Sequence, residues 1–298
     1  MRVVVTGSSG LIGRALLVRL RHEGHEVTPL VRRAPSVGEA HWDPARGVLD
    51  EAVLEGVDAV VNLAGAGIGD RRWTTTRKQE ILESRVSSTS LLSSALAATE
   101  GRPATLVNAS AIGFYGDRGD ELLTEESAPG TGFLAEVCRA WEAATAPAES
   151  AGVRVVHLRN AVVLARHAGA LARQLPLFRL GLGARLGRGD QWFSWITLRD
   201  ELSAILLVLE QPALVGAVNC TSASPVTNAR FTSALGKALH RPAALAVPRP
   251  ALRLALGRQL ADEAVTASLR VVPRRLEASG FAFEDRSIEE ALASVLSG

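Results

Sequence analysis

The N-terminal stretch from Met1 to Arg19 constrains the fold more than any other part of the chain. A β-branched run at Val3 to Val5 is followed by Gly7, Gly10 and Gly13, and then by leucines at helical spacing. This order predicts a turn that binds the phosphates of a dinucleotide at the helix N-terminus, where unpaired N–H groups and the helix dipole favour negative charge. The alternative is a strand-turn-helix unit that binds nothing.

Each glycine of this turn has its own expected role. Gly7 permits the tight turn, Gly10 lets backbone N–H groups approach a pyrophosphate, and Gly13 lets the helix pack closely on the strand. The other residues expected to bind the cofactor here are Thr6, Ser9, Leu11 and Ile12.

Further apolar runs alternate between strand and helix character. Strands are predicted at residues 25–31, 41–43, 58–67, 105–110 and 153–163, with helices at 73–98 and from 132 onward. This alternation predicts an α/β protein with a Rossmann-like, doubly wound parallel sheet. We predict an NAD(P)-binding domain over residues 1–165 and a smaller C-terminal substrate-capping region over residues 166–298, whose strands could return to the main sheet.

The end of the second predicted strand decides between the two nicotinamide dinucleotides. An acidic residue about twenty residues beyond the glycine turn would bind the ribose 2'-hydroxyl of NAD, whereas an arginine can pair with the 2'-phosphate of NADP. Arg32 and Arg33 occupy this position, which favours NADP over NAD unless both arginines are merely solvated. Asp43 is expected near the adenine amino group or, equally, as a turn residue before Pro44.

Small residues follow the strand predicted at 58–67. Because ligands bind outside the carboxyl ends of the strands, Leu63, Ala64 and Gly65 are expected along the cofactor. Arg85 on the next helix is added to the cofactor-binding set, with a solvated surface arginine as the alternative.

The strand predicted at 105–110 ends at residues that are expected to take part in the reaction. Ser110 is expected to hydrogen-bond a substrate oxygen, and Tyr115, the only tyrosine, is either a proton donor or a loop anchor.

The glycine-rich aromatic stretch at 169–200 is expected to be a mobile loop that covers a ligand. Gln191, Trp192 and Ser194 would then face the substrate, and the alternative is a loop that packs in the core. Thr197 and Asp200 have the spacing of a helix start before an apolar helix at 202–209.

Composition excludes several classes of partner. With 33 basic and 31 acidic residues, the chain has no charge excess that would favour nucleic acid or an anionic membrane. No uncharged run is long enough to span a bilayer, and the two cysteines form neither a disulfide framework nor a metal motif. We therefore expect a cytoplasmic protein with a small-molecule substrate, no metal, and a homodimer as one candidate assembly.

Several motifs together resemble a known superfamily. TGSSGLIG, NLAG and SAIGFYG occur in the order used by the extended branch of the short-chain dehydrogenases/reductases. More narrowly, HWDP, RRWT with KQEILESR, GFLAEVCRAWE, GRGDQWFSWI and VVPRRLEASGFAFE resemble the NAD(P)-dependent epimerase/dehydratase-like family, whose atypical members are commonly described as sugar-nucleotide epimerases. The resemblance covers essentially the whole chain and implies a small polar substrate, with a nucleotide-sugar as one candidate.

The chain departs from the superfamily's usual Tyr-x-x-x-Lys pair, in which the lysine lowers the pKa of the tyrosine for proton transfer. Four residues after Tyr115 stands Gly119, and the only lysines are Lys78 and Lys237. Arg85 stands where the superfamily tends to have an asparagine.

Two side chains could replace the missing pair. Glu136 could act as acid or base if it is buried, and Tyr115 could donate a proton if it lies near Arg85 or Arg139. Cys138 is expected to be a small buried hydrophobe. The sequence thus predicts an NADP-binding oxidoreductase or epimerase, the alternative being a protein that binds NADP as a sensor without turnover.

Overall fold

An eight-stranded sheet forms the centre of the molecule, with the order β13-β8-β6-β5-β1-β2-β3-β4. The computed structural model describes residues 1–101 and 103–297. The strands are β1 (Arg2–Thr6), β2 (Glu26–Val31), β3 (Ala40–Asp43), β4 (Val48–Leu49), β5 (Ala59–Asn62), β6 (Thr105–Ala111), β8 (Arg154–Asn160) and β13 (Gly216–Cys220). Neighbouring strands are parallel except β3 and β4, which form an antiparallel edge. This confirms the predicted doubly wound α/β fold.

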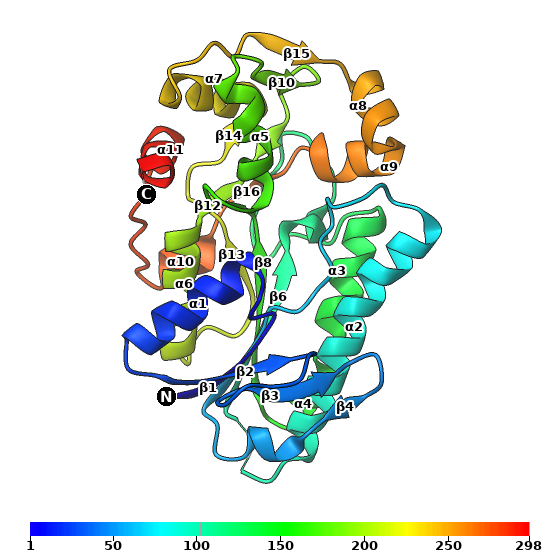
Figure 1. Ribbon diagram of the computed structural model, residues 1–298, viewed down its shortest axis with the longest axis vertical. Helices are drawn as coiled ribbons and strands as arrows, with labels where there is room; N and C mark the ends of the chain where they lie inside the picture. The colour runs from blue at the N-terminus through cyan, green and yellow to red at the C-terminus, as the bar shows by residue number, and fades with distance from the viewer. Residues whose placement is uncertain (102, 298) are drawn as a thin grey trace.

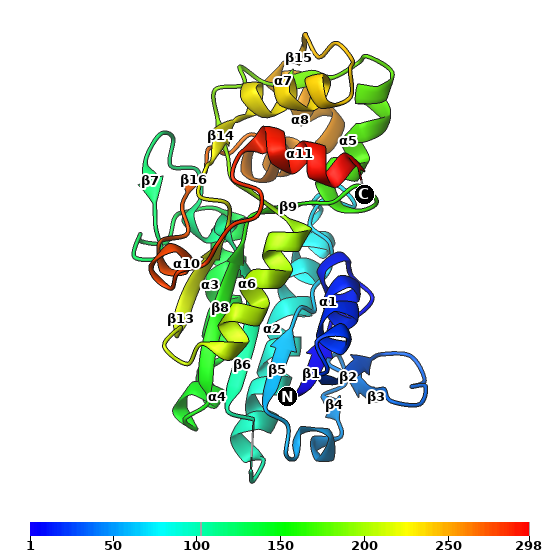
Figure 2. The same cartoon turned by 90° about the vertical axis from the view of Figure 1, so that its left-hand side faces the viewer.

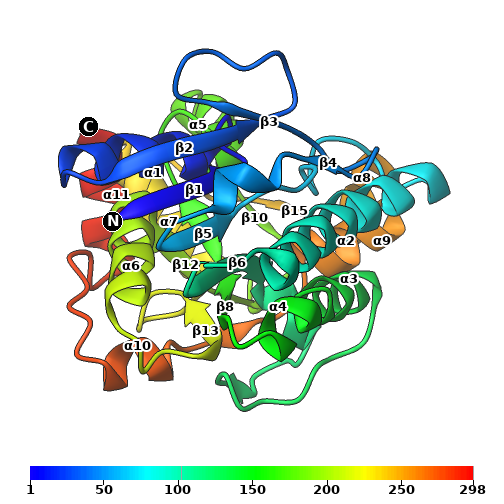
Figure 3. The same ribbon diagram turned by 90° about the horizontal axis from the view of Figure 1, so that it is seen from below.

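Helices cover both faces of the sheet (Figure 3). One face carries α1 (Leu11–His22) and α6 (Leu198–Glu210), and the other carries α2 (Thr75–Ala98), α3 (Phe133–Ala143) and α4 (Ala146–Ser150). Side chains alternate along a strand, so Val3 and Val5 pack in the core under α1 and α6 while Val4 packs in the core under α2.

A smaller lobe lies over the carboxyl ends of the strands (Figures 1 and 2). It contains α5 (Gly169–Arg179), β10 (Ala184–Leu186), β11 (Trp192–Phe193), β14 (Val226–Thr227), α7 (Asn228–Ala238), β15 (Leu245–Val247), α8 (Arg249–Leu256), α9 (Arg258–Leu260), η3 (Ala261–Val265) and α11 (Ile288–Ser297). Its core includes the buried side chains of Leu171, Trp195, Phe231 and Leu292.

Short elements join the lobe to the sheet. They are η2 (Ile112–Tyr115), the strand pairs β9 (Val162–Leu164) with β12 (Trp195–Thr197) and β7 (Leu122–Leu123) with β16 (Arg270–Val271), and α10 (Arg274–Ala278). A further short helix, η1 (Glu51–Leu54), connects β4 to β5.

The two predicted regions interleave in space. β13 and α6 follow residue 165 in sequence, yet β13 pairs with β8, and buried side chains of α6 share a core with Leu16 and Leu20 of α1. The sheet therefore includes elements from both sides of the predicted boundary.

The expectation of an irregular loop over 169–200 was wrong for its first third. Residues 169–179 form helix α5, which buries Leu171, Leu175 and Phe178. This is helical spacing, but Pro176 inside the segment and the many glycines after it obscured the pattern. Among the described residues, no helix is long and apolar enough to cross a membrane.

Candidate functional site

The glycine turn between β1 and α1 has the geometry of a phosphate-binding loop. Gly7 has a φ of +65°, and a Cβ atom on it would lie 2.5 Å from the carbonyl oxygen of Leu63. A Cβ atom on Gly13 would lie 2.2 Å from the carbonyl oxygen of Gly7, so the helix packs against the turn. Ser9 and Gly10 are exposed, and no side chain of a described residue caps the helix. The first N–H groups of α1 thus remain free for a ligand.

Thr6 and Asn62 fix the loop that faces this turn. The Thr6 hydroxyl donates to Asn62 Oδ1 at 2.6 Å and accepts from the Leu63 backbone N–H at 3.1 Å. Asn62 Nδ2 in turn donates to Asn108 Oδ1 at 2.7 Å. Thr6 is fully buried and therefore positions the loop at 63–65 through these bonds.

The two arginines after β2 differ in what they contact. Arg33 donates to Glu39 Oε1 at 2.6 Å. Arg32 is exposed and has no hydrogen bond or ion pair to any described residue. Asp43 accepts from the backbone N–H of Ala45 at 3.1 Å, which is the turn role considered for it. Arg32 is therefore the arginine available to a phosphate.

Ser110, at the end of β6, belongs to a buried polar chain. Its hydroxyl donates to Glu142 Oε1 at 2.6 Å. Arg159 Nε and Nη2 bind the two oxygens of Glu142 at 2.9 and 2.8 Å, and Arg159 Nη1 donates to the Tyr115 hydroxyl at 3.0 Å. The Tyr115 hydroxyl donates to Asn219 Oδ1 at 2.7 Å. The chain joins β6, α3, β8 and β13 at the carboxyl edge of the sheet.

Tyr115 is fully buried in this chain. Burial raises the pKa of the phenol, although Arg159 acts in the opposite direction. Because its hydroxyl already donates to Asn219 and accepts from Arg159, the structure favours the anchor role over proton transfer.

Glu136 does not meet the condition set for it, because it lies on the exposed face of α3. The buried face of α3 carries Ala135, Cys138 and Trp141, so a carboxylate at 136 points away from the end of β6. Glu142 is the acid beside Ser110, and reasoning from the sequence missed it. Its position four residues after buried Cys138 was the available signal.

Cys138 is buried as expected. Burial raises the pKa of its thiol to about 11, so the thiolate is not populated at neutral pH.

Arg85 is buried, so the alternative of a solvated surface arginine was wrong. Its Nη1 atom donates to the carbonyl oxygens of Ala66 and Ile81, each at 3.0 Å. Its guanidinium carbon lies 4.9 Å from the centre of the Trp141 ring. A Cβ atom on Gly65 would lie 3.2 Å from this carbon, so the arginine packs directly on the loop after β5.

The three residues expected to bind substrate are used within the fold. Gln191 Nε2 donates to the Leu186 carbonyl at 3.0 Å, and Ser194 Oγ donates to the Leu269 carbonyl at 2.8 Å. Trp192 Nε1 donates to Asp120 Oδ1 at 2.8 Å. Their placement agrees with the alternative of a packing loop.

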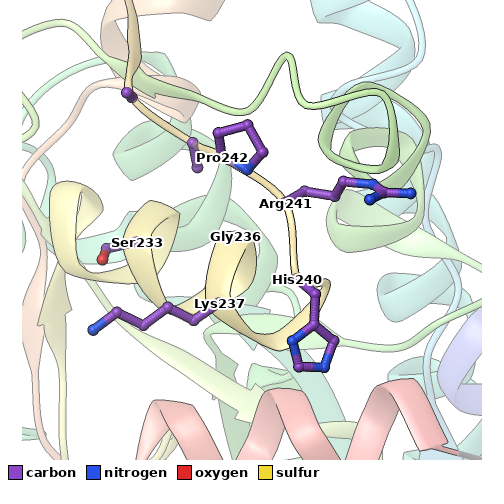
Figure 4. A pocket seen from close by; sticks show the side chains of 8 residues that line it. Ser233, Gly236, Lys237, His240, Arg241 and Pro242 are labelled. Atoms are coloured by element: carbon purple, nitrogen blue, oxygen red, sulfur yellow. The ribbon is translucent and has the colours of Figure 1, made fainter.

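A basic depression of about 660 Å³ lies elsewhere, in the small lobe (Figure 4). Lys237, His240 and Arg241 line it, and their side chains point in different directions. They do not converge on a common point. No group of three or more potential metal ligands occurs among residues 1–101 and 103–297.

An open parallel sheet, a glycine turn with an uncapped helix behind it and a lobe over the strand ends define a protein of the Rossmann class. Comparison with known proteins narrows the class. The chain belongs to the NAD dependent epimerase/dehydratase family, whose model matches residues 3–220, and it is an extended short-chain dehydrogenase/reductase. Residues 247–295 match a domain of unknown function, DUF1731.

Related proteins match over nearly the whole chain. Epimerase family protein Mb2239 of Mycobacterium bovis is 48% identical over 291 residues, covering 97% of this chain and 96% of that protein. Human epimerase family protein SDR39U1 is 36% identical, covering 99% of this chain and all of that protein. A crystal structure of the human protein with NADPH superposes with a TM-score of 0.92 at 34% identity and full coverage of both chains.

Proposed function

We propose that this protein binds NADP(H) and transfers hydride between the nicotinamide and a small polar substrate. The observation that carries the proposal is Arg32, which is exposed at the end of β2 without a partner among the described residues. Its guanidinium is free to pair with a 2'-phosphate, which NAD lacks. The crystal structure of human SDR39U1 with NADPH supports the same choice of cofactor.

The expected cofactor contacts follow the carboxyl edge of the sheet. Backbone N–H groups of the turn and the first helical residues would hold the pyrophosphate. Asp43 would lie near the adenine, and the loop after β5 would lie along the ribose and nicotinamide. The turn residues are Gly7, Ser9, Gly10, Leu11 and Ile12, and the loop residues are Leu63, Ala64 and Gly65.

Ser110 is proposed to orient the substrate. Its hydroxyl hydrogen is donated to Glu142, whose two oxygens also accept from Arg159, so the Ser110 oxygen presents lone pairs to its other neighbours. A substrate hydroxyl could therefore donate to Ser110. When bound, the cofactor supplies the hydride chemistry. A nucleotide-sugar is one candidate substrate from the family.

Cofactor selectivity tests the assignment of Arg32. We expect NADPH to bind more tightly than NADH by about 1–3 kcal/mol, the scale of a charge-assisted contact. Arg32→Ala should abolish this preference and leave NADH binding unchanged, as measured by nicotinamide fluorescence titration. Arg33→Ala is the matched control, because Arg33 is already paired with Glu39.

Equal affinities for the two cofactors, or an unchanged preference in Arg32→Ala, would contradict this proposal. Turnover is tested separately with NADPH and a panel of carbonyl compounds and sugar nucleotides. Tight NADPH binding without turnover on any of them would overturn hydride transfer and leave a sensor.

A further inference from the structure

Arg85 is a buried cation without an acidic partner among the described residues. It is 7% exposed, and its only hydrogen bonds to described residues run from Nη1 to the carbonyl oxygens of Ala66 and Ile81. Its Nε and Nη2 atoms, which form one edge of the guanidinium, have no hydrogen-bond partner in the part of the chain that is described.

Neither atom of this edge is fully sealed from solvent. The side-chain atoms that are sealed from solvent without a partner include Nε of Arg77, two turns earlier on the same helix, but no atom of Arg85. Arg77 is also ion-paired, with Glu80 at 2.6 Å and Asp70 at 3.6 Å. Arg85 thus differs from Arg77 in two ways: its unpaired nitrogen atoms are not sealed from solvent, and its charge has no acidic partner among the described residues.

Arg85 lies on the far side of β5 from the glycine turn. Arg85 contacts Gly65, just after β5, and the ring of Trp141 on α3. One turn before Trp141, Cys138 Sγ donates to the Ala111 carbonyl at the end of β6 at 3.6 Å. Phosphates held at the turn would be at the end of β1, with β5 in between. The region between the ends of β5 and β6 is where the reacting end of a dinucleotide would meet its substrate.

A buried charge is costly unless it is paired. Burial lowers the pKa of Arg85 to about 10, with the charge of Arg77 adding to the effect, so the guanidinium is still protonated at neutral pH. A bound anion would compensate this charge.

The same molecule shows what such an edge binds. Nε and Nη2 of Arg159 hold the two oxygens of the Glu142 carboxylate at 2.9 and 2.8 Å. In Arg85 the corresponding edge has no partner among the described residues, and Trp141 and Gly65 both lie against the guanidinium. A planar carboxylate fits a planar edge with two parallel hydrogen bonds.

We propose that Arg85 binds a carboxylate of the substrate, so that the reaction acts on a carbonyl compound that also carries a carboxylate. This inference rests on the proposed hydride transfer. In the reductive direction the carbonyl carbon gains the hydride and the carbonyl oxygen gains one proton from solvent, while NADPH becomes NADP⁺. Arg85 is then a determinant of specificity that separates acids from their neutral analogues.

The test compares short-chain 2-oxo acids with their methyl esters as ligands of the NADPH-loaded protein, by calorimetry. At least one acid should bind about tenfold or more tightly than its ester. Arg85→Met should remove this difference, and Arg85→Lys should keep part of it. Arg139→Ala, which removes an exposed arginine on α3, is the control and should keep all of it.

No acid preference in the wild-type protein, or an undiminished preference in Arg85→Met, would overturn the proposal. Arg85-dependent binding of inorganic phosphate but of no carboxylate would overturn it too. The acid-to-ester ratio is taken within one protein, so partial loss of folded protein does not change it.

NADPH titration of the same variants separates this proposal from the proposed function. Arg85→Met should bind NADPH within about twofold of the wild-type affinity. A loss of about tenfold or more in NADPH affinity with an unchanged acid-to-ester ratio would assign Arg85 to the cofactor instead. If the wild-type protein fails to bind NADPH, the proposed function fails, and the acid and ester titrations still test Arg85 without cofactor.

Discussion

The carboxyl group of Glu201 is buried and inaccessible to solvent. It lies in the first turn of α6 and is fully buried, with the side-chain amide of Asn160 3.0 Å from Oε1 and no partner for Oε2 among the described residues. Burial raises the pKa of this carboxyl group to about 8. In the folded protein the acid is therefore neutral over a range in which the unfolded chain is ionised.

This difference should make stability fall as pH rises. Between the ordinary pKa of 4.5 and the folded value of about 8, the folded state holds a proton that the unfolded state has lost. The free energy of unfolding should then decrease by up to about 1.4 kcal/mol for each pH unit across this window.

Glu201→Gln should remove this slope, so that the variant gains stability relative to wild type as pH rises from 5 to 8. Urea unfolding at several pH values measures it. Glu210→Gln, an exposed position on the same helix, is the matched control and should leave the slope in place. Parallel pH profiles for wild type and Glu201→Gln would show that Glu201 is ionised in the folded protein.

At the scale of elements, the acidic side chains of α3 divide into two kinds. Glu142 lies on the buried face and joins β6 to β8 through Ser110 and Arg159, whereas Glu136 lies on the exposed face. The C-terminal end of α3 is thus held against the sheet by an ion pair with Arg159 as well as by apolar packing.

Removing the Glu142 charge should leave Arg159 buried without a counter-ion. Glu142→Gln is therefore expected to lower the free energy of unfolding by about 3 kcal/mol. The same change at Glu136 should cost less than about 0.5 kcal/mol, because that side chain is exposed. Denaturant unfolding of both variants provides the comparison, and similar losses in the two would refute the structural role of Glu142.

The elements around α3 were predictable from the sequence, but the side-chain pairings of this helix were not. Local periodicity predicted helices α2 and α6 and six strands of the main sheet, namely β1, β2, β3, β5, β6 and β8, but not the two-residue strand β4. The pairing of Glu142 with Arg159 was not predictable, since the two side chains come together only when α3 packs over β8. Arg85 was expected to be either solvated or a cofactor ligand, because helical spacing alone did not reveal that the loop at Gly65 and the ring of Trp141 bury it.

At the scale of the whole molecule, sheet and lobe are not separable pieces of chain. A fragment of residues 1–165 would lack β13, which pairs with β8, and α6, which covers the core around Val107 and Val156. We expect this fragment to lack a cooperative thermal transition in circular dichroism, whereas the full chain should show one. A cooperative transition in the fragment would mean that the first region folds alone.

The strand pairing between the lobe and the sheet also suggests a way to detect ligands. Residues 162–164 and 195–197 pair as parallel strands between the lobe and the sheet. Unfolding of the lobe or of the sheet would therefore disrupt this pairing and destabilise the other part. A molecule held at the strand ends should therefore raise the melting temperature of the entire chain, including helices that it never touches. The melting temperature of the intact protein can therefore be used to detect binding of compounds of unknown chemistry.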